Sequence, residues 1–145
     1  MNVGTAKQVT RVENHHGFSV LVIDDERDTA ATLKRGLESK GPFTVSAFTE
    51  PLDALKSIEH DSYHILLIDV LMPKMNGLEF CQKALESAQD ALVVFITASE
   101  NYIDEYRRSY PKLNGHTFII KPVSIARLSK FLLSELGVLL EKNSD

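Results

Sequence analysis

Short apolar runs recur along the chain, and longer stretches with alternating apolar and polar positions separate them. The run Ile65–Ile68 holds four consecutive Ile and Leu residues and ends abruptly at Asp69. An unbroken run of this kind is typical of a strand that is buried on both faces, as in a parallel sheet. Comparable patterns predict five strands in all, at residues 18–23, 43–48, 65–68, 91–96 and 116–120.

The segments between these strands have apolar residues at helical spacing. Leu52, Leu55 and Ile58 form the expected apolar face of the second helix. Thr49 is the expected N-cap of that helix, and Pro51 lies in its first turn. Helices are predicted at residues 27–40, after Thr49, after Asn76-Gly77, at 101–110 and from about Ser124 onward.

Five strands that alternate with five helical segments predict an α/β fold with a parallel sheet covered on both faces. Residues 1–17 are polar and lack a sustained period, so we interpret them as an N-terminal arm. The domain itself is expected at residues 18–140 and a short C-terminal tail at 141–145. Residues after 140 are too few for an output domain, which favours a stand-alone domain over a fragment of a longer chain.

The composition is that of one soluble globular domain, with 43% hydrophobic and 25% charged residues in a chain of 145. A formal net charge of −4 gives no electrostatic case for nucleic-acid or membrane binding. Cys81 is the sole cysteine of the sequence, so an intramolecular disulfide is excluded, and a reducing compartment fits best. No apolar stretch approaches the roughly 20 residues of a membrane span. A cytoplasmic location is therefore expected.

Polar residues stand where four of the five predicted strands end, and packing does not explain them. They are Asp24-Asp25, Asp69, Thr97 and Lys121. The carboxyl ends of parallel strands share one edge of the sheet, so these side chains can meet there. A single acid at a strand end is more often a turn former or a helix cap, but the whole set points to a shared site.

Carboxylates packed together repel one another, which raises their pKa values unless a cation compensates. Oxygen ligands without Cys or His suit a hard divalent ion such as Mg²⁺, which keeps open positions for phosphate oxygens. Lys121 and Thr97 then supply a positive charge and a hydroxyl donor for a phosphoryl group. Asp69 is the candidate nucleophile, because a carboxylate can form an aspartyl phosphate.

The chain resembles a response-regulator receiver domain over about residues 18 to 138. The matching motifs are Val22-Ile23-Asp24-Asp25, Ile68-Asp69 followed by Met72-Pro73-Lys74-Met75-Asn76-Gly77, Thr97-Ala98 and Lys121-Pro122. The resemblance implies a flavodoxin-like, doubly wound sheet of five parallel strands in the order 2-1-3-4-5. It also implies a two-component phosphorelay protein that is phosphorylated by a histidine kinase, or by a small donor such as acetyl phosphate.

Carried over to this chain, the resemblance makes Asp69 the phosphoacceptor. Asp25 and Asp69 would bind Mg²⁺ directly, together with the main-chain carbonyl of Leu71, and Asp24 would bind it mainly through water. These assignments imply a phosphoprotein that catalyses only its own phosphorylation and dephosphorylation, and is not otherwise an enzyme.

The resemblance assigns the remaining roles to residues near the ends of the last two strands. Lys121 would pair with Asp69 and later with the phosphoryl group, and Thr97 would donate a hydrogen bond to that group. Thr97 and Phe118 would form the switch that transmits phosphorylation. Phe118 is equally explained as an ordinary core residue of its strand.

Two other functions compete with this interpretation. A haloacid-dehalogenase-type phosphohydrolase expects a second acid two residues after its nucleophile, but Leu71 stands there. A receiver fold that acts as an unphosphorylated interaction module is the other alternative. A nucleotide-binding domain is disfavoured, because no GxGxxG or P-loop follows any strand.

Two segments could form partner surfaces, although the downstream protein target is unknown. Residues 101–110 are unusually polar and aromatic, which fits either a solvated helix or a partner surface. The last helix has a broad apolar face that includes Phe131, Leu133, Val138 and Leu140. That face could support a homodimer or simply pack on its own sheet.

Overall fold

Five parallel strands form one sheet in the order β2-β1-β3-β4-β5, as predicted. The computed structural model describes residues 17–113 and 115–144, so the expected N-terminal arm lies outside it except for Gly17. The strands are β1 (Phe18–Ile23), β2 (Phe43–Phe48), β3 (Ile65–Asp69), β4 (Leu92–Thr97) and β5 (Thr117–Ile120). The helices are α2 (Arg27–Lys40), α3 (Pro51–His60), α4 (Gly77–Ala84), α5 (Asn101–Ser109), the short 3₁₀ helix η1 (Pro111–Leu113) and α6 (Ile125–Ser144).

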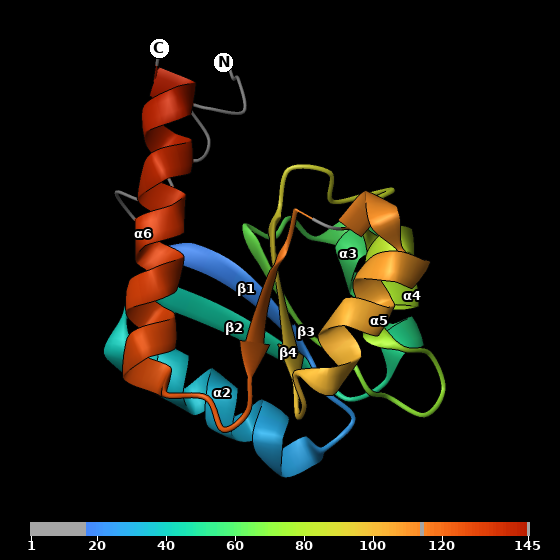
Figure 1. Cartoon of the computed structure of the whole chain (residues 1–145). Helices are drawn as coiled ribbons and strands as arrows, with labels where there is room; N and C mark the ends of the chain where they lie inside the picture. Colours follow the sequence, from blue (N-terminus) through green and yellow to red (C-terminus); the bar gives the residue numbers. More distant parts are fainter. Residues whose placement is uncertain (1–16, 114, 145) are drawn as a thin grey trace.

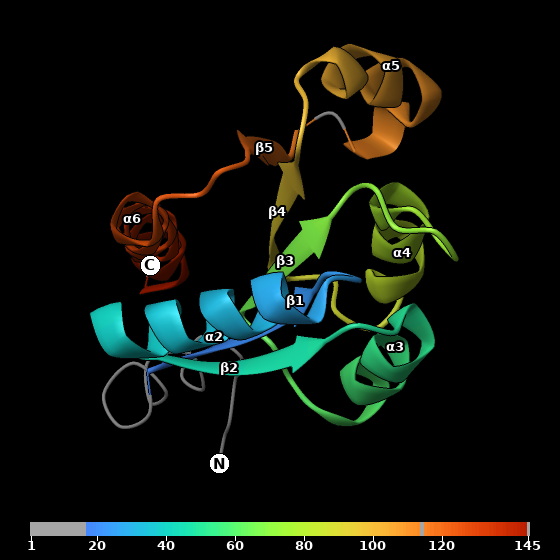
Figure 2. The same cartoon turned by 90° about the horizontal axis from the view of Figure 1, so that it is seen from below.

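The helices form two layers around the sheet. Figures 1 and 2 show α2 and α6 side by side on one face, and α3, α4 and α5 on the other. Alternate residues of each central strand face the two layers, so Leu67 joins one core and Ile68 the other. Both faces of β3 are buried, which explains its unbroken apolar run.

The strand register brings the functional end of the sheet together. Ile23 of β1 lies beside Ile68 of β3, and Asp69 lies beside Ile96 of β4. Thr97 in turn lies beside Ile120 of β5, so the residues at or just after the ends of β1, β3, β4 and β5 lie at one edge of the sheet. The predicted convergence of the strand ends is therefore a feature of the fold.

The β3–α4 connection is tightly packed against the end of β3. Asn76 caps α4, since its side chain accepts hydrogen bonds from the main-chain N–H groups of Leu78 and Glu79, both at 2.9 Å. A Cβ atom at Gly77 would collide with the main-chain carbonyl of Asp69. Glycine is thus required here by a close approach between α4 and the strand end.

The start of α3 differs from the sequence prediction. Glu50, not Thr49, occupies the N-cap position, and no side chain caps this helix. Leu52 is 66% exposed, whereas Pro51, Ala54 and Ile58 face the core. The buried face of α3 begins at Pro51, the first residue of the helix. The sequence prediction instead began this face at Leu52, one residue later.

The outer edge of β2 is covered by two side chains of α2. Lys34 Nζ donates to the main-chain oxygen of Val45 over 2.7 Å, and Glu38 accepts from the Val45 N–H over 3.0 Å. Lys34 and Glu38 also form an ion pair at 3.1 Å. The edge strand therefore has its outward-facing backbone groups at Val45 already bonded.

The two last helices pack very differently. None of the residues of α5 is buried, which fits the solvated interpretation of this segment. In α6, Leu128, Leu132 and Leu136 are buried against the core that α2 shares. Its helical backbone continues through Ser144, into the segment expected as a tail, whereas Val138 and Leu140 lie outside the residues whose side chains are described.

The apolar face of α6 is at least partly used within the domain. Phe131 and Leu133 are partly buried and pack against the same core. A homodimer through the last helix stays a prediction. None of the helices in the described part of the chain is long and apolar enough to cross a membrane.

Candidate functional site

Three carboxylates meet at the carboxyl edge of the sheet. Asp24 and Asp25 follow β1, and Asp69 is the last residue of β3. One carboxylate oxygen from each lies within 4.8 Å of the other two. Asp24 is 2% exposed and Asp69 6% exposed, whereas Asp25 is open to solvent. Such oxygen atoms at this spacing fit a hard divalent cation.

Both oxygen atoms of Asp24 have partners within the protein. Oδ1 accepts a hydrogen bond from the main-chain N–H of Glu26 at 2.9 Å, and Oδ2 accepts one from Lys121 Nζ at 3.1 Å. These bonds fix the carboxylate in one orientation. Asp24 therefore holds the β1–α2 turn and Lys121 in place, in addition to contributing charge to the acid cluster.

The electrostatic environment of Asp69 is unfavourable for its own negative charge. Burial raises the pKa of this carboxyl to about 7, and the charges of Asp24 and Asp25 contribute to the increase. Lys121 acts in the opposite direction, with its Nζ 3.5 Å from Asp69 Oδ1. The attraction of one lysine does not offset the effects of burial and of two neighbouring acids on the pKa of Asp69. A further positive charge at this site would therefore be favourable.

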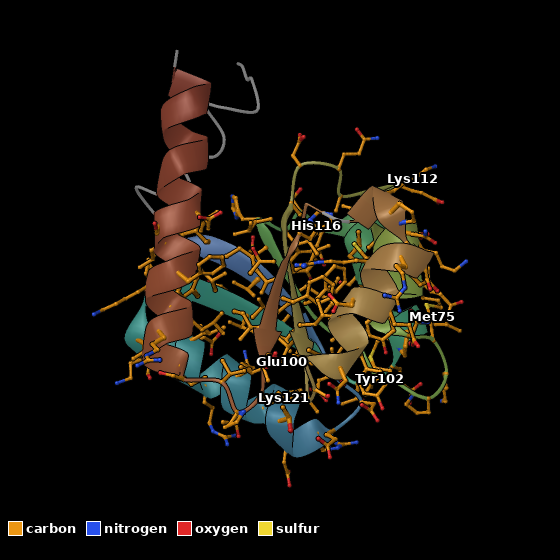
Figure 3. The ribbon with its side chains drawn as sticks, in the orientation of Figure 1. Met75, Glu100, Tyr102, Lys112, His116 and Lys121 are labelled. Carbon is orange, nitrogen blue, oxygen red and sulfur yellow. The ribbon has the colours of Figure 1, made fainter. Side chains whose placement is uncertain are left out.

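Lys121 reaches the acids from the end of β5. Burial by itself would lower the pKa of its ammonium, but Asp24 and Asp69 outweigh this effect and the pKa is raised. The main-chain N–H of Lys121 donates to the Thr97 carbonyl at 2.8 Å, which ties the ends of β5 and β4 together. Figure 3 shows Lys121 and Glu100 at this same end of the sheet.

The sequence of residues 20–133 matches the family profile described as "Response regulator receiver domain". This match covers most of the chain, and the sheet order and acid cluster described above agree with it. The chain belongs to the response regulator receiver domain family. Its relatives are thus the response regulators of two-component systems.

Two curated relatives illustrate the match of this receiver domain. The transcriptional regulatory protein PcoR of Escherichia coli is 27% identical over 109 residues, which cover 75% of this chain and 47% of PcoR. The probable transcriptional regulator ycf27 of Cyanidium caldarium is 29% identical over 137 residues, which cover 94% of this chain and 53% of the relative. The chain thus spans about half the length of these relatives.

Solved structures show that the receiver fold is shared. The BeF3-activated receiver domain of DrrB superposes with a TM-score of 0.71 at 20% identity, over 83% of this chain and 98% of DrrB's. A CheY-like receiver from Methanospirillum hungatei superposes with a TM-score of 0.69 at 22% identity. The match covers 88% of this chain and 97% of the other. TrrA of Thermotoga maritima, solved with Mg²⁺-BeF, superposes with a TM-score of 0.68 at 24% identity. The match covers 81% of this chain and 97% of TrrA.

The receiver's Thr97 is completely buried at the end of β4. Its hydroxyl donates to the Ser99 carbonyl at 3.3 Å and accepts from the Ser99 N–H at 3.4 Å. Both bonds lie within the β4–α5 turn, and both are long. The hydroxyl therefore has only weak bonds to lose if it turns toward a group on Asp69.

Phe118 is half-buried in a stack of three groups. Its ring packs on Phe95 with centroids 5.0 Å apart and an interplanar angle of 26°. The Arg107 guanidinium lies 5.3 Å from the centroid of the Phe118 ring. Phe118 is partly buried and packs against the core that includes Phe95, and its contact with Arg107 connects β5 with α5. The switch role of Phe118 stays a prediction.

The sequence interpretation missed a pocket beside the acids. It has a volume of about 290 Å³. Its lining residues are Asp25, Arg27, Thr49, Glu50, Pro51, Met72, Pro73 and Lys74. Three different connections supply these residues, and no single motif contains them. The quoted sequence motifs contain four of the lining residues, Asp25, Met72, Pro73 and Lys74, but they do not show that Arg27 and the start of α3 complete the pocket.

Proposed function

We propose that this receiver is a phosphoacceptor of a two-component phosphorelay and that Asp69 accepts the phosphoryl group. The donor would be a phosphohistidine of a histidine kinase or phosphotransfer protein in the cytoplasm. The observation that carries the proposal is the meeting of three carboxylates within 4.8 Å, with Lys121 next to two of them. An aspartate placed in this way can attack phosphorus while its neighbours position the phosphoryl oxygens.

The residues present fit a Mg²⁺ ion. Asp25, Asp69 and the main-chain carbonyl of Leu71 would bind it directly, and Asp24 through water, because both oxygens of Asp24 already have protein partners. Burial raises the pKa of Asp69 to about 7, and the charges of Asp24 and Asp25 add to the increase, which a divalent cation would oppose. When bound, the ion supplies charge neutralisation for the phosphoryl oxygens. TrrA, a structural neighbour, was solved with Mg²⁺-BeF.

The chain's own groups perform the transfer. One oxygen of Asp69 attacks phosphorus as the bond to the donor nitrogen breaks, and transfer of this kind depends mainly on positioning and charge. Lys121 Nζ is close enough to follow the negative charge from Asp69 to the phosphoryl oxygens. The buried Thr97 hydroxyl can exchange its weak bonds to Ser99 for a stronger one to the phosphoryl group.

Phosphorylation would then change the surface near β4, α5, β5 and α6. Movement of Thr97 would displace the end of β4. Phe118 would follow, because its ring stacks on Phe95 of β4, and it would carry the motion to Arg107 of α5. The altered surface would bind a partner or a second copy. The domain acts on its own phosphate and otherwise signals by binding.

Intact-mass analysis after incubation with acetyl phosphate and Mg²⁺ tests the proposal. The wild type should gain one phosphoryl group, and Asp69→Ala should gain none. Asp90→Asn is the control, because Asp90 is an exposed carboxylate outside the acid cluster. It should be phosphorylated like the wild type. Absence of phosphorylation in the wild type with every donor would favour an unphosphorylated interaction module.

A further inference from the structure

The pocket of about 290 Å³ shares a wall with the acid cluster, because Asp25 belongs to both. The pocket is bounded by the β1–α2 turn, the start of α3 and the β3–α4 loop. A group that leaves phosphorus beside Asp69 therefore has a pocket on the far side of Asp25 that could receive it. The proposed function does not use this space.

The two cations of the pocket differ in their partners. Lys74 Nζ lies 2.8 Å from Glu50 Oε1, so its charge is already paired. Arg27 has no acidic side-chain oxygen within 4.0 Å in the described part of the chain. A guanidinium without an acidic partner, in a pocket that also contains Asp25 and Glu50, is a specific binding group for an anion, since these acids themselves repel anions.

We propose that this pocket receives the carboxylate leaving group of an acyl phosphate and that Arg27 binds it. This inference rests on the proposed phosphorylation of Asp69. In the reaction, a bond forms between an Asp69 oxygen and phosphorus, and the bond between phosphorus and the acyl oxygen breaks. The electron pair of that bond stays on the acyl oxygen, so the product is a carboxylate and no proton is transferred.

A carboxylate in this pocket lies beside Asp25 and Glu50, so it needs a nearby cation to offset their repulsion. The planar guanidinium fork of Arg27 matches a carboxylate with two parallel hydrogen bonds. The size of the pocket is at the lower end of the range for small-molecule sites, which is roughly 300–1,000 Å³. It therefore suits a short-chain acid such as acetate. Pro51, Met72 and Pro73 provide apolar contacts for the alkyl part.

Two small phosphodonors with different leaving groups distinguish an effect of Arg27 on the leaving group from an effect on the phosphoryl site. Acetyl phosphate releases an anionic carboxylate, whereas phosphoramidate releases neutral ammonia. The apparent second-order rate constant of phosphorylation is measured with each donor, by intact mass, for the wild type, Arg27→Gln, Arg27→Lys and Arg35→Gln. Arg35→Gln is the matched control, because Arg35 is an exposed arginine of the same helix that does not line the pocket.

For Arg27→Gln, the rate constant with acetyl phosphate should fall about tenfold, the effect of one lost charge-assisted hydrogen bond. With phosphoramidate it should change less than twofold. Arg27→Lys, which keeps the charge but not the fork, should be intermediate, and Arg35→Gln should match the wild type with both donors. Beryllofluoride has no leaving group, so Arg27→Gln should bind it with unchanged affinity.

Equal losses with both donors, or no loss with either, would overturn the assignment of Arg27. Weakened beryllofluoride binding would also overturn it, because the substitution would then act on the phosphoryl site itself. A wild type that neither donor phosphorylates contradicts the proposed function instead, which keeps the two failures distinct.

Discussion

The Lys121 ammonium forms its hydrogen bond with Asp24, at 3.1 Å, and lies slightly farther from Asp69, at 3.5 Å. The sequence interpretation expected Lys121 to pair with Asp69, and the structure shows it between the two acids. This position leaves Asp69 without a short hydrogen bond to Lys121 that an attack on phosphorus would first have to break. It also lets Lys121 stay bonded to the protein while the charge on Asp69 changes.

Replacing Lys121 with Met should raise the pKa of Asp69 beyond its present value of about 7, because the attraction that opposes burial is removed. Titration of the carboxyl carbon by NMR measures this directly. The variant should also lose about 1–3 kcal/mol of stability near neutral pH, since Asp24 keeps a buried charge without its cation. Lys112→Met is the control, because Lys112 lies far from Lys121 in Figure 3. An unchanged Asp69 titration would contradict the electrostatic account.

Asp69→Asn should stabilise the metal-free protein, and the gain should grow with pH. The folded-state pKa of Asp69 is raised to about 7 from an ordinary 3.8, so between these values the folded state binds more protons than the unfolded one. Stability contributed by the protonated carboxyl is therefore lost as pH rises through this window.

Urea unfolding without Mg²⁺ should show Asp69→Asn close to the wild type at low pH and more stable by about 2 kcal/mol near pH 8. Asp90→Asn removes an exposed carboxylate and should leave the pH dependence unchanged. A gain that is the same at all pH values would count against a raised Asp69 pKa.

Leu71→Asn should shorten the lifetime of the phosphoryl group several-fold. Leu71 is two residues past Asp69 and is 43% exposed, and its apolar side chain cannot orient a water molecule for attack on phosphorus. Decay is followed by intact mass after removal of the donor. Leu52→Asn is the control, because Leu52 is an exposed leucine on α3. If Leu71→Asn decays no faster than the wild type, another residue sets the lifetime.

Glu38→Ala should make the β2 edge prone to self-association. Glu38 and Lys34 occupy the outward N–H and carbonyl of Val45, and loss of Glu38 frees that N–H for another strand. The free energy of unfolding should fall by about 1 kcal/mol. Light scattering at rising concentration should show association that the neighbouring Ser39→Ala lacks.

Residues at strand ends could be predicted from the sequence, because a buried strand has a clear apolar pattern and parallel strands end at one edge. Asp24, Asp25, Asp69, Thr97 and Lys121 were found in this way, and the structure brings the three acids and Lys121 together. The roles assigned to them stay proposals.

Other features depend on how separate connections meet, which spacing does not encode. The exposure of Leu52 follows from where α3 begins, and that start was misplaced. The placement of Arg107 on Phe118 and the shared pocket of Arg27 and Lys74 are tertiary contacts between distant segments. The local sequence does not determine them.

The contact between Gly77 and the carbonyl of Asp69 has a consequence for how substitutions in the β3–α4 loop are interpreted. Even the smallest side chain at position 77 would push the strand end away from its neighbours and carry the carboxylate with it. A screen that scores folding alone would record such a change as a helix defect. The substitution would nevertheless displace the Asp69 carboxylate. Tolerance of substitutions at position 77 therefore depends on phosphorylation as well as on folding.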